Sequence, residues 1–230
     1  MAGIYFNIST PEVGGIDEYT KLMLHLDGDY SDVSDSNHTI ATAGNPSFDS
    51  SIKKFGSDSI NLDGSGDYLG TDDHIDWYFG ADDFTIDCWV YLTSATTVSI
   101  YSQLANIGLD NNRIMYGFWT GYWNFYVRTS SVIIDVKVAD SSPATGEWVH
   151  IALTRSGNNF RFFKNGNQIG TTQTSSAAVP NNIGPLRLGV CRLGGTFPIV
   201  MNGRMDEVRI SKGIARWTSN FTPPTAPYIT

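Results

Sequence analysis

Long hydrophobic runs are missing from this sequence of 230 residues. No stretch approaches the roughly 20 consecutive apolar residues that a membrane-spanning helix needs. The first residues, MAGIYFNISTPEVGG, also lack the charged start and the apolar core of a signal peptide. We therefore expect no membrane partner and no secretion or anchoring segment in this sequence.

Basic residues are scarce, because 15 Lys and Arg face 23 Asp and Glu and the formal net charge is −8. Surfaces that bind duplex DNA or anionic membranes need a basic patch, so we expect no nucleic-acid partner. Glutamate is rarer still, since only Glu12, Glu18, Glu147 and Glu207 occur and every other acid is Asp. Aspartate favours turns and sites for hard cations, whereas glutamate favours helices.

Cysteine is limited to Cys88 and Cys191, which are too few for a disulfide framework. Cys88 lies in the apolar row of the segment FTIDCWVYL, a setting that predicts a buried free thiol. A disulfide between the two cysteines remains the alternative.

Helical periodicity is almost absent, and runs with a period of two recur between turn residues instead. The stretch 83–93, DFTIDCWVYLT, is nearly continuous in apolar and aromatic residues, which predicts a central strand buried on both faces. Hairpins are predicted at Thr120-Gly121 and at Asn165-Gly166, because Asn-Gly suits a type I′ turn. Further strands are expected at 22–26, 59–62, 147–156, 186–190 and 204–210. This spacing indicates an all-β sandwich or jelly roll of antiparallel strands.

The first 18 residues differ from the rest of the chain. Ile4, Phe6 and Ile8 alternate with polar residues before Pro11 interrupts the pattern. We interpret 1–18 as an extra edge strand or a flexible leader. The alternative is an arm that pairs with a neighbouring chain and makes a homo-oligomer. The domain itself is expected to span residues 19–230.

Six blocks of the sequence resemble laminin-G-like, concanavalin-A-like lectin jelly-roll domains, in the right order from about Tyr19 to the C-terminus. They are LMLHLDGDYSDVSDSNHT, INLDGSGDYLGTDD, FGADDFTIDCWVYLTS, GEWVHIALTRSGNNFRFFKNGNQIG, PLRLGVCRLGG and MNGRMDEVRISKGIARWTSNFTPPTAPY. The resemblance implies a sandwich of two curved antiparallel sheets, a role in glycan binding or adhesion, and often a structural calcium ion. The closing stretch ISKGIARWTSNFTPPTAP is most similar to modules in phage and marine-virus structural proteins, which implies a virion-surface or extracellular location.

Catalytic patterns are not found. The β-glucanases of this superfamily carry Glu-x-Asp-x-x-Glu on one strand face, where alternate carboxylates line a cleft, and no such run occurs here. Asp83 and Asp87 share a face within the stretch 83–93, but they match an ordinary core strand of the family. The four histidines are scattered without metal-ligand spacing. We expect no enzymatic activity.

Aromatic residues offer the best candidate for a ligand site. Trp119, Tyr122 and Trp123 crowd one predicted hairpin, and Arg128 ends it. Sugar rings stack on such aromatic faces while polar groups orient the hydroxyls. The alternative is that the tryptophans belong to the core.

We therefore expect a non-catalytic carbohydrate-binding or adhesion module of a phage virion surface or tail protein that recognises host glycans. The alternatives are a structural capsid decoration protein that binds other coat subunits, a secreted microbial adhesion module, and a glycan-cleaving enzyme.

Asp206 raises a separate question, because period-two alternation places it on the same face as Val208 and Ile210. A buried carboxylate must be neutralised, hydrogen-bonded or bound to a cation. One candidate partner is Arg204. The other is a structural Ca²⁺, held by oxygens from Asp206 and from the Asp-rich loop 25–37. The resemblance also implies such a site, because members of this family often connect their first and last strands through a calcium ion. We predict Asp27 and Asp206 as its first ligands, followed by Asp35.

Overall fold

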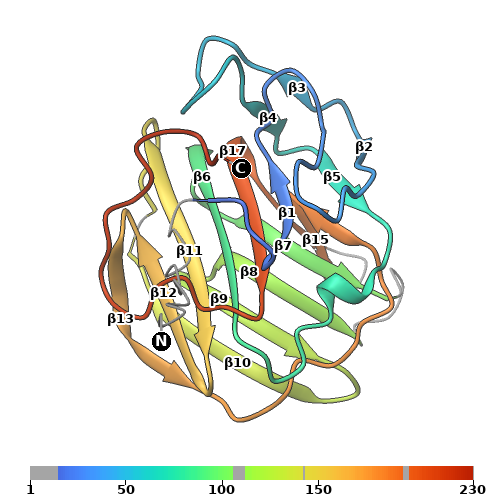
Figure 1. The fold of residues 1–230 in the computed structure, drawn as a ribbon, viewed down its shortest axis with the longest axis vertical. Helices are drawn as coiled ribbons and strands as arrows, with labels where there is room; N and C mark the ends of the chain where they lie inside the picture. The colour runs from blue at the N-terminus through green and yellow to red at the C-terminus, as the bar shows by residue number, and fades with distance from the viewer. Residues whose placement is uncertain (1–14, 106–111, 142, 194–196, 230) are drawn as a thin grey trace, which may run out of the picture.

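The computed structural model describes residues 15–105, 112–141, 143–193 and 197–229. Two antiparallel sheets lie face to face, and the C-terminal segment runs across the outside of one of them (Figure 1). This arrangement confirms the all-β, two-sheet jelly-roll sandwich.

The eight-stranded sheet has the order β13-β12-β11-β6-β17-β4-β3, with β1 also paired to β17. Because β6 lies between β11 and β17, the prediction of a central strand at 83–93 is confirmed. Its strands are β1 (Thr20–Leu24), β3 (Ser47–Phe48), β4 (Ile60–Asp63), β6 (Phe84–Ser94), β11 (Trp148–Ser156), β12 (Asn159–Lys164), β13 (Asn167–Thr174) and β17 (Asn202–Lys212).

The seven-stranded sheet has the order β10-β9-β8-β7-β14-β5-β2. A separate two-stranded ribbon, β15 (Val190–Leu193) with β16 (Phe197–Val200), packs beside β7, and a single turn of 3₁₀ helix, η1 (Ile75–Trp77), precedes β6. The strands of the sheet are β2 (Ala41–Ala43), β5 (Tyr68–Thr71), β7 (Val98–Leu104), β8 (Arg113–Trp119), β9 (Tyr122–Arg128), β10 (Val132–Ala139) and β14 (Leu186–Leu188).

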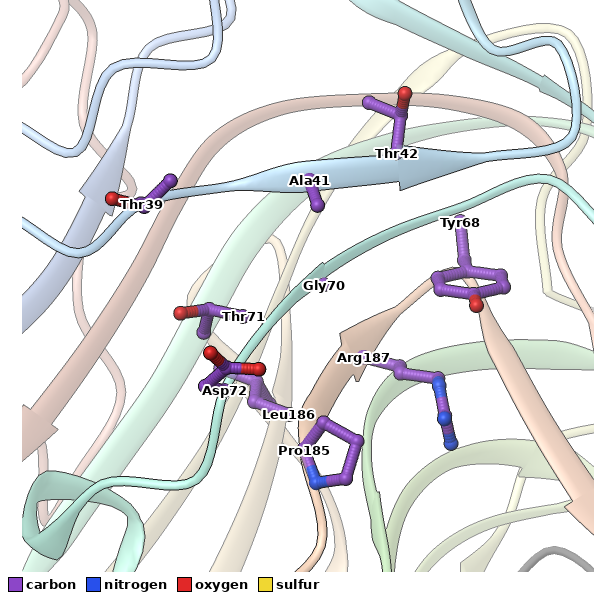
Figure 2. Close-up of a pocket in the computed structure, with 10 residues that line it drawn as sticks. All are labelled: Thr39, Ala41, Thr42, Tyr68, Gly70, Thr71, Asp72, Pro185, Leu186 and Arg187. Carbon is purple, nitrogen blue, oxygen red and sulfur yellow. The ribbon is translucent and has the colours of Figure 1, made fainter.

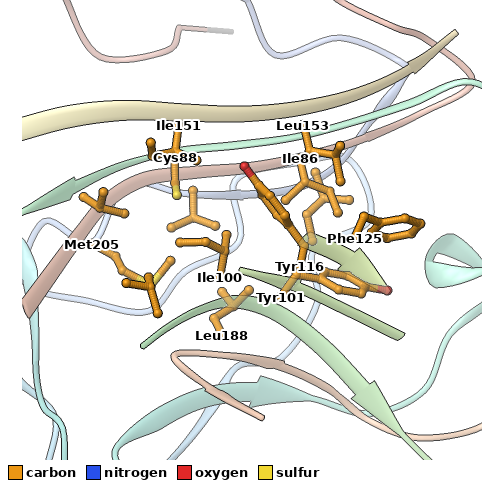
Figure 3. Close-up of a cluster of buried hydrophobic side chains, with 14 of the residues drawn as sticks. Ile86, Cys88, Ile100, Tyr101, Tyr116, Phe125, Ile151, Leu153, Leu188 and Met205 are labelled. Carbon is orange, nitrogen blue, oxygen red and sulfur yellow. The ribbon is translucent and has the colours of Figure 1, made fainter. Parts of the chain in front are cut away.

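The core fills the space between the two sheets. Ile86, Cys88 and Ile151 point from the eight-stranded sheet toward Ile100 and Tyr116 of the seven-stranded sheet (Figure 3). Alternate strand residues face opposite sides of a sheet, so the residues between them in sequence lie on the outer faces. Cys88 and Cys191 are both buried free thiols, as predicted for Cys88.

Both predicted hairpins are present. Thr120 and Gly121 have φ angles of 52° and 84°, and Asn165 and Gly166 have 48° and 75°, as a type I′ turn requires. β7 and β10 lie where no strand was predicted. β10 nevertheless alternates buried and exposed residues along most of its length.

The predicted alternation in β17 is wrong. Met205, Val208 and Ile210 face the core, whereas Asp206 lies opposite Trp89 on the outer side. A bulge between Asp206 and Arg209, with Glu207 at a φ of 51°, shifts the phase of the strand by one residue.

Residues 1–14 of the proposed arm 1–18 lie outside the described residues, so its role in pairing stays a prediction. Gly15 forms a parallel bridge with Ile229, and Ile16 N donates to the carbonyl of Ile229 at 2.9 Å. The two described ends of the chain therefore meet beside the eight-stranded sheet.

Candidate functional site

A shallow cleft of about 260 Å³ lies at the edge of the seven-stranded sheet. Tyr68 and Arg187 lie together at one end of it, and Thr71 and Asp72 lie at the other (Figure 2). The lining residues are Thr39, Ala41, Thr42, Tyr68, Gly70, Thr71, Asp72, Pro185, Leu186 and Arg187.

Strand register explains the hollow. β5 lies between β2 and β14, so that Gly70 pairs with Ala41 on one side and with Arg187 on the other. Leu69 and Leu188, one residue along, point into the core. The outer row therefore carries two small residues beside the long side chain of Arg187, which leaves a depression.

The polar groups of the cleft are not paired with one another. The Arg187 guanidinium lies 5.4 Å from the centroid of the Tyr68 ring. Within the described residues it has no hydrogen bond and no ion pair, and neither has the exposed Asp72 carboxylate. An aromatic face, a cation and a carboxylate are thus all available to a ligand in one hollow.

The predicted aromatic platform requires a correction at Trp123. This side chain is fully buried in the core, and its Nε1 donates to Asp140 Oδ2 at 3.1 Å. The hairpin turn consists of only Thr120 and Gly121, so alternation sends Trp123 to the inner face of the sheet and Tyr122 to the outer face. A buried ring cannot stack on a sugar.

The other predicted ligand residues are spread out. Trp119 packs against a small apolar cluster under the β15–β16 ribbon, and its cross-strand partner Tyr122 is 39% exposed. Arg128, at the far end of β9, lines a separate cleft of about 200 Å³ with Asn112 and Asn182. The structure therefore makes Trp119 and Tyr122 neighbours but places Arg128 away from them.

Asp206 is fully buried and is held by backbone amides. Its Oδ2 accepts hydrogen bonds from Lys54 N at 2.8 Å and Phe55 N at 3.2 Å, while its buried Oδ1 has no partner among the described residues. Burial raises the pKa of Asp206 to about 7, although the two amides act to lower it. The predicted partner Arg204 instead pairs with Asp49 at 2.8 Å.

Asp27 holds the same loop from the other side. Its Oδ1 accepts hydrogen bonds from Ser57 N at 2.7 Å and Asp58 N at 3.2 Å. A Cβ at Gly56 would come within 2.0 Å of both carboxylate oxygens of Asp27, so the loop closes tightly on this group. Asp35 is exposed and is not grouped with Asp27 and Asp206.

One set of three metal-ligand side chains does meet in the described part of the chain. The donor atoms of His38, His74 and Asp76 lie within 4.8 Å of one another, although the sequence analysis treated the histidines as scattered. The fold brings the loop after β1 against η1, which no local spacing reveals. The signal available in the sequence was the short motif His74-x-Asp76.

Asp83 and Asp87 do not form a hydrolytic pair. Asp87 is fully buried, and burial acts to raise its pKa, but Arg209 together with His150 and Tyr228 outweighs this and lowers the pKa below its usual range. Asp83 Oδ1 accepts a hydrogen bond from Gly157 N at 2.6 Å. A carboxylate sealed from solvent cannot reach a polysaccharide.

The family model of the concanavalin A-like lectin/glucanases superfamily matches residues 63–216. Among solved structures, domain 4 of AbnA, an extracellular GH43 arabinanase from Geobacillus stearothermophilus solved with arabinotriose, has a TM-score of 0.65 and 19% identity. It covers 85% of this chain and 93% of that domain.

Two toxin structures share the fold as well. The binding domain of Paraclostridial Mosquitocidal Protein 1 has a TM-score of 0.63 and 15% identity over 86% of this chain. A botulinum neurotoxin type C structure, whose cell entry is described as dependent on two ganglioside molecules, has a TM-score of 0.63 and 13% identity over 87%. The chain spans 50% of each of these two proteins.

Among curated proteins the comparison finds no match. Among the described residues, no helix is long and apolar enough to cross a membrane.

Proposed function

Because the chain belongs to the concanavalin A-like lectin/glucanase superfamily, we propose that it is a non-catalytic glycan-binding module whose site is the cleft at Tyr68, Asp72 and Arg187. The observation that carries this proposal is the open cleft itself, in which the Arg187 guanidinium lies 5.4 Å from the centroid of the Tyr68 ring and the Asp72 carboxylate makes no hydrogen bond or ion pair among the described residues.

The chemistry of the cleft suits a sugar. The C–H face of a pyranose or furanose ring packs on the Tyr68 ring, while the Arg187 guanidinium donates to hydroxyl oxygens and the Asp72 carboxylate accepts from hydroxyl groups. The small residues Ala41 and Gly70 let a ring approach the sheet closely. A shallow polar depression of this kind binds one or two sugar units and leaves the rest of a chain in solvent.

Two features support binding rather than cleavage. Glycoside hydrolysis in most families needs two carboxylates flanking the scissile bond, and Asp72 is the single carboxylate among the ten residues that line the cleft. The AbnA domain, similar over most of both chains, was solved with arabinotriose, and cell entry of the type C neurotoxin depends on interaction with two ganglioside molecules.

We place the module on a virion surface or in an extracellular protein, where it recognises host glycans. This part rests on the resemblance of the closing segment ISKGIARWTSNFTPPTAP, residues 210–227, to modules of phage and marine-virus structural proteins. The rival role is a capsid decoration protein that binds other coat subunits, and it requires a contiguous interface of about 800 Å² per partner rather than a small cleft.

We also propose that Asp27 and Asp206 hold a structural Ca²⁺. The fit rests on the buried Oδ1 of Asp206, which has no partner among the described residues, and on the tight closure of Gly56 over the Asp27 carboxylate. A bound calcium ion would neutralise both carboxylates and tie β17 to the segment after β1. Asp35, the third predicted ligand, is exposed and stays a weaker candidate than the buried Asp206.

A glycan array tests the proposed function and its location. Wild type, Tyr68→Ala and Tyr122→Ala are compared on plant, algal, bacterial and animal glycans. We expect wild type and Tyr122→Ala to bind the same glycans and Tyr68→Ala to bind none. Loss in Tyr122→Ala alone would move the site to the β8–β9 hairpin, and the absence of any binding together with capsid binding would favour the decoration role.

A further inference from the structure

Two histidines from distant parts of the sequence meet one aspartate. His38 Nε2 lies 3.0 Å from Asp76 Oδ2, and His74 Nδ1 lies 3.1 Å from the same oxygen. Two imidazole nitrogens and one carboxylate oxygen form a ligand set that suits zinc and its neighbouring transition metals, whereas calcium prefers oxygen ligands throughout.

The backbone holds both halves of this cluster in place. Asp32, which is only 4% exposed, accepts hydrogen bonds from Met23 N at 2.9 Å and from His38 N at 2.8 Å, and so anchors the loop before His38 to β1. On the other side, His74 Nδ1 accepts a hydrogen bond from Asp76 N at 3.3 Å and so caps η1, and a metal ion bound at this nitrogen would replace that hydrogen bond.

Neighbouring side chains orient the ligands further. The His38 ring packs against Trp77 at a centroid distance of 4.5 Å, and Trp77 is buried in the core. Ser36 Oγ donates to Asp76 Oδ2 at 2.8 Å. Such outer contacts fix ring and carboxylate orientation in metal sites.

We propose that His38, His74 and Asp76 bind one borderline divalent cation of the zinc type. Ligand bonds of about 2.0–2.2 Å separate tetrahedral ligand atoms by about 3.3–3.5 Å, which is close to the observed spacing around Asp76. The side chain of His74 is 49% exposed and has room to make the adjustment of about an ångström that closure requires.

The site has one open side. Three protein ligands leave a fourth position for water or an exogenous ligand, and the exposed His74 marks the side on which solvent enters. Two charges of opposite effect lie nearby: the exposed Asp72 and Asp73 add carboxylates that favour a cation, whereas the Lys212 ammonium, which donates to the carbonyl of Ile75 at 2.8 Å, opposes one.

The metal would join two segments that reach the cleft. Thr39 follows His38 directly, and Asp72 precedes His74 by two residues; both line the cleft described above. A cation bound by His38, His74 and Asp76 therefore ties the loop after β1 to the segment that precedes η1. The inference does not depend on glycan binding.

Calorimetric titration of Zn²⁺ into the tag-free full chain at about pH 7.5, with calcium present throughout, tests the site. We expect one zinc ion per chain, and a loss of affinity of at least about tenfold in His74→Asn and in Asp76→Asn. Asparagine at position 74 keeps a side-chain oxygen that can cap η1, so this variant should remain folded. His25→Asn, the same exchange at a histidine outside the cluster, should bind zinc like wild type.

Two further readings sharpen the test. Co²⁺ should give a visible absorption band in wild type that His74→Asn lacks, and excess Zn²⁺ should remove that band because both ions occupy the same site. Equal zinc affinity in wild type and His74→Asn, or no saturable binding in wild type, would overturn the proposal.

Discussion

The outer faces of the two sheets carry the same kinds of residue and use them in opposite ways. On the eight-stranded sheet, Asp87 and Arg209 are fully buried, and Arg209 Nε lies 3.1 Å from Asp87 Oδ1. His150 Nε2 lies 3.3 Å from Asp87 Oδ2, and the Tyr228 hydroxyl donates to the same oxygen. On the seven-stranded sheet, Arg187 is half-buried beside the Tyr68 ring and makes no ion pair among the described residues.

The C-terminal segment accounts for the difference. It runs across the eight-stranded sheet (Figure 1), where Trp217 stacks on Phe221 at 3.9 Å and the Tyr228 ring lies 3.9 Å from the Arg209 guanidinium. No described segment covers the cleft in this way. Breaking a sealed and paired charge should therefore cost stability, whereas the half-buried Arg187 and the exposed Asp72 remain accessible to the glycan that we propose.

Replacing Asp87 by Ala should have the largest effect. The exchange leaves Arg209 buried without its carboxylate and should lower the free energy of unfolding by about 3–5 kcal/mol, measured by urea denaturation. The matched control is Asp135→Ala, since Asp135 makes an exposed pair with Lys137 at 3.3 Å and should change stability by less than about 1 kcal/mol. Equal losses of unfolding free energy in the two variants would contradict the difference that we expect between buried and exposed charge pairs.

The exchange Tyr228→Phe removes one hydroxyl donor from the same network. We expect a loss of about 1–3 kcal/mol in the free energy of unfolding, because Asp87 remains buried with one hydrogen bond fewer. Limited proteolysis should also release the C-terminal segment sooner than in wild type. If the variant is as stable as wild type and as resistant to proteolysis, Tyr228 does not help to hold the C-terminal segment on the eight-stranded sheet.

Asp206 provides a pH test without calcium. Its pKa in the folded protein is about 7, above the value of 3.8 expected for an unperturbed aspartate. The folded state therefore binds the proton more tightly, so the stability contributed by this group is present at low pH and is lost as pH rises toward 7. We expect the fall in stability between about pH 5 and pH 8 to be smaller in Asp206→Asn.

Calcium should reverse that trend. The ion binds the ionised carboxylate, so added calcium should raise the melting temperature at about pH 8 and have little effect at about pH 5. Asp27→Asn and Asp206→Asn should each abolish the calcium effect, and Asp35→Asn should keep it. An unchanged melting temperature in wild type at about pH 8, with no metal found by elemental analysis, would exclude the calcium site.

Arg187→Met should have the smallest effect on stability. The guanidinium has no ion pair in the described residues, and the new side chain keeps the apolar stem, so we expect a change within about 0.5 kcal/mol. Denaturation beside wild type measures it. A loss of unfolding free energy comparable to that of Asp87→Ala would show that Arg187 stabilises the fold, which would count against its role as a ligand-binding residue.

Much of the fold follows from local pattern. The nearly continuous apolar run of β6 predicts a central strand, and Asn165-Gly166 predicts the hairpin between β12 and β13. Both features act through neighbouring residues alone. The face of Asp206 could not be predicted in this way. A bulge depends on how β17 pairs with β6, and Glu207 carries no sequence signal for a positive φ.

The candidate site is harder to predict for a similar reason. Crowded tryptophans pointed to the β8–β9 hairpin, but Trp123 fills the core because large aromatic rings gain most from burial. The cleft needs Ala41, Tyr68 and Arg187 from three strands that are distant in sequence. The hollow arises because Ala41 lies opposite Gly70, and this pairing cannot be predicted before the strand register is known.

The most direct measurement is a calorimetric titration of the best glycan from the array into wild type, Arg187→Met and Tyr122→Ala. Binding at the cleft predicts that Arg187→Met, although as stable as wild type, loses at least about tenfold in affinity, because a charge-assisted hydrogen bond to the ligand is gone. Tyr122→Ala should bind like wild type. Unchanged affinity in Arg187→Met together with loss in Tyr122→Ala would contradict the assignment of the cleft as the binding site.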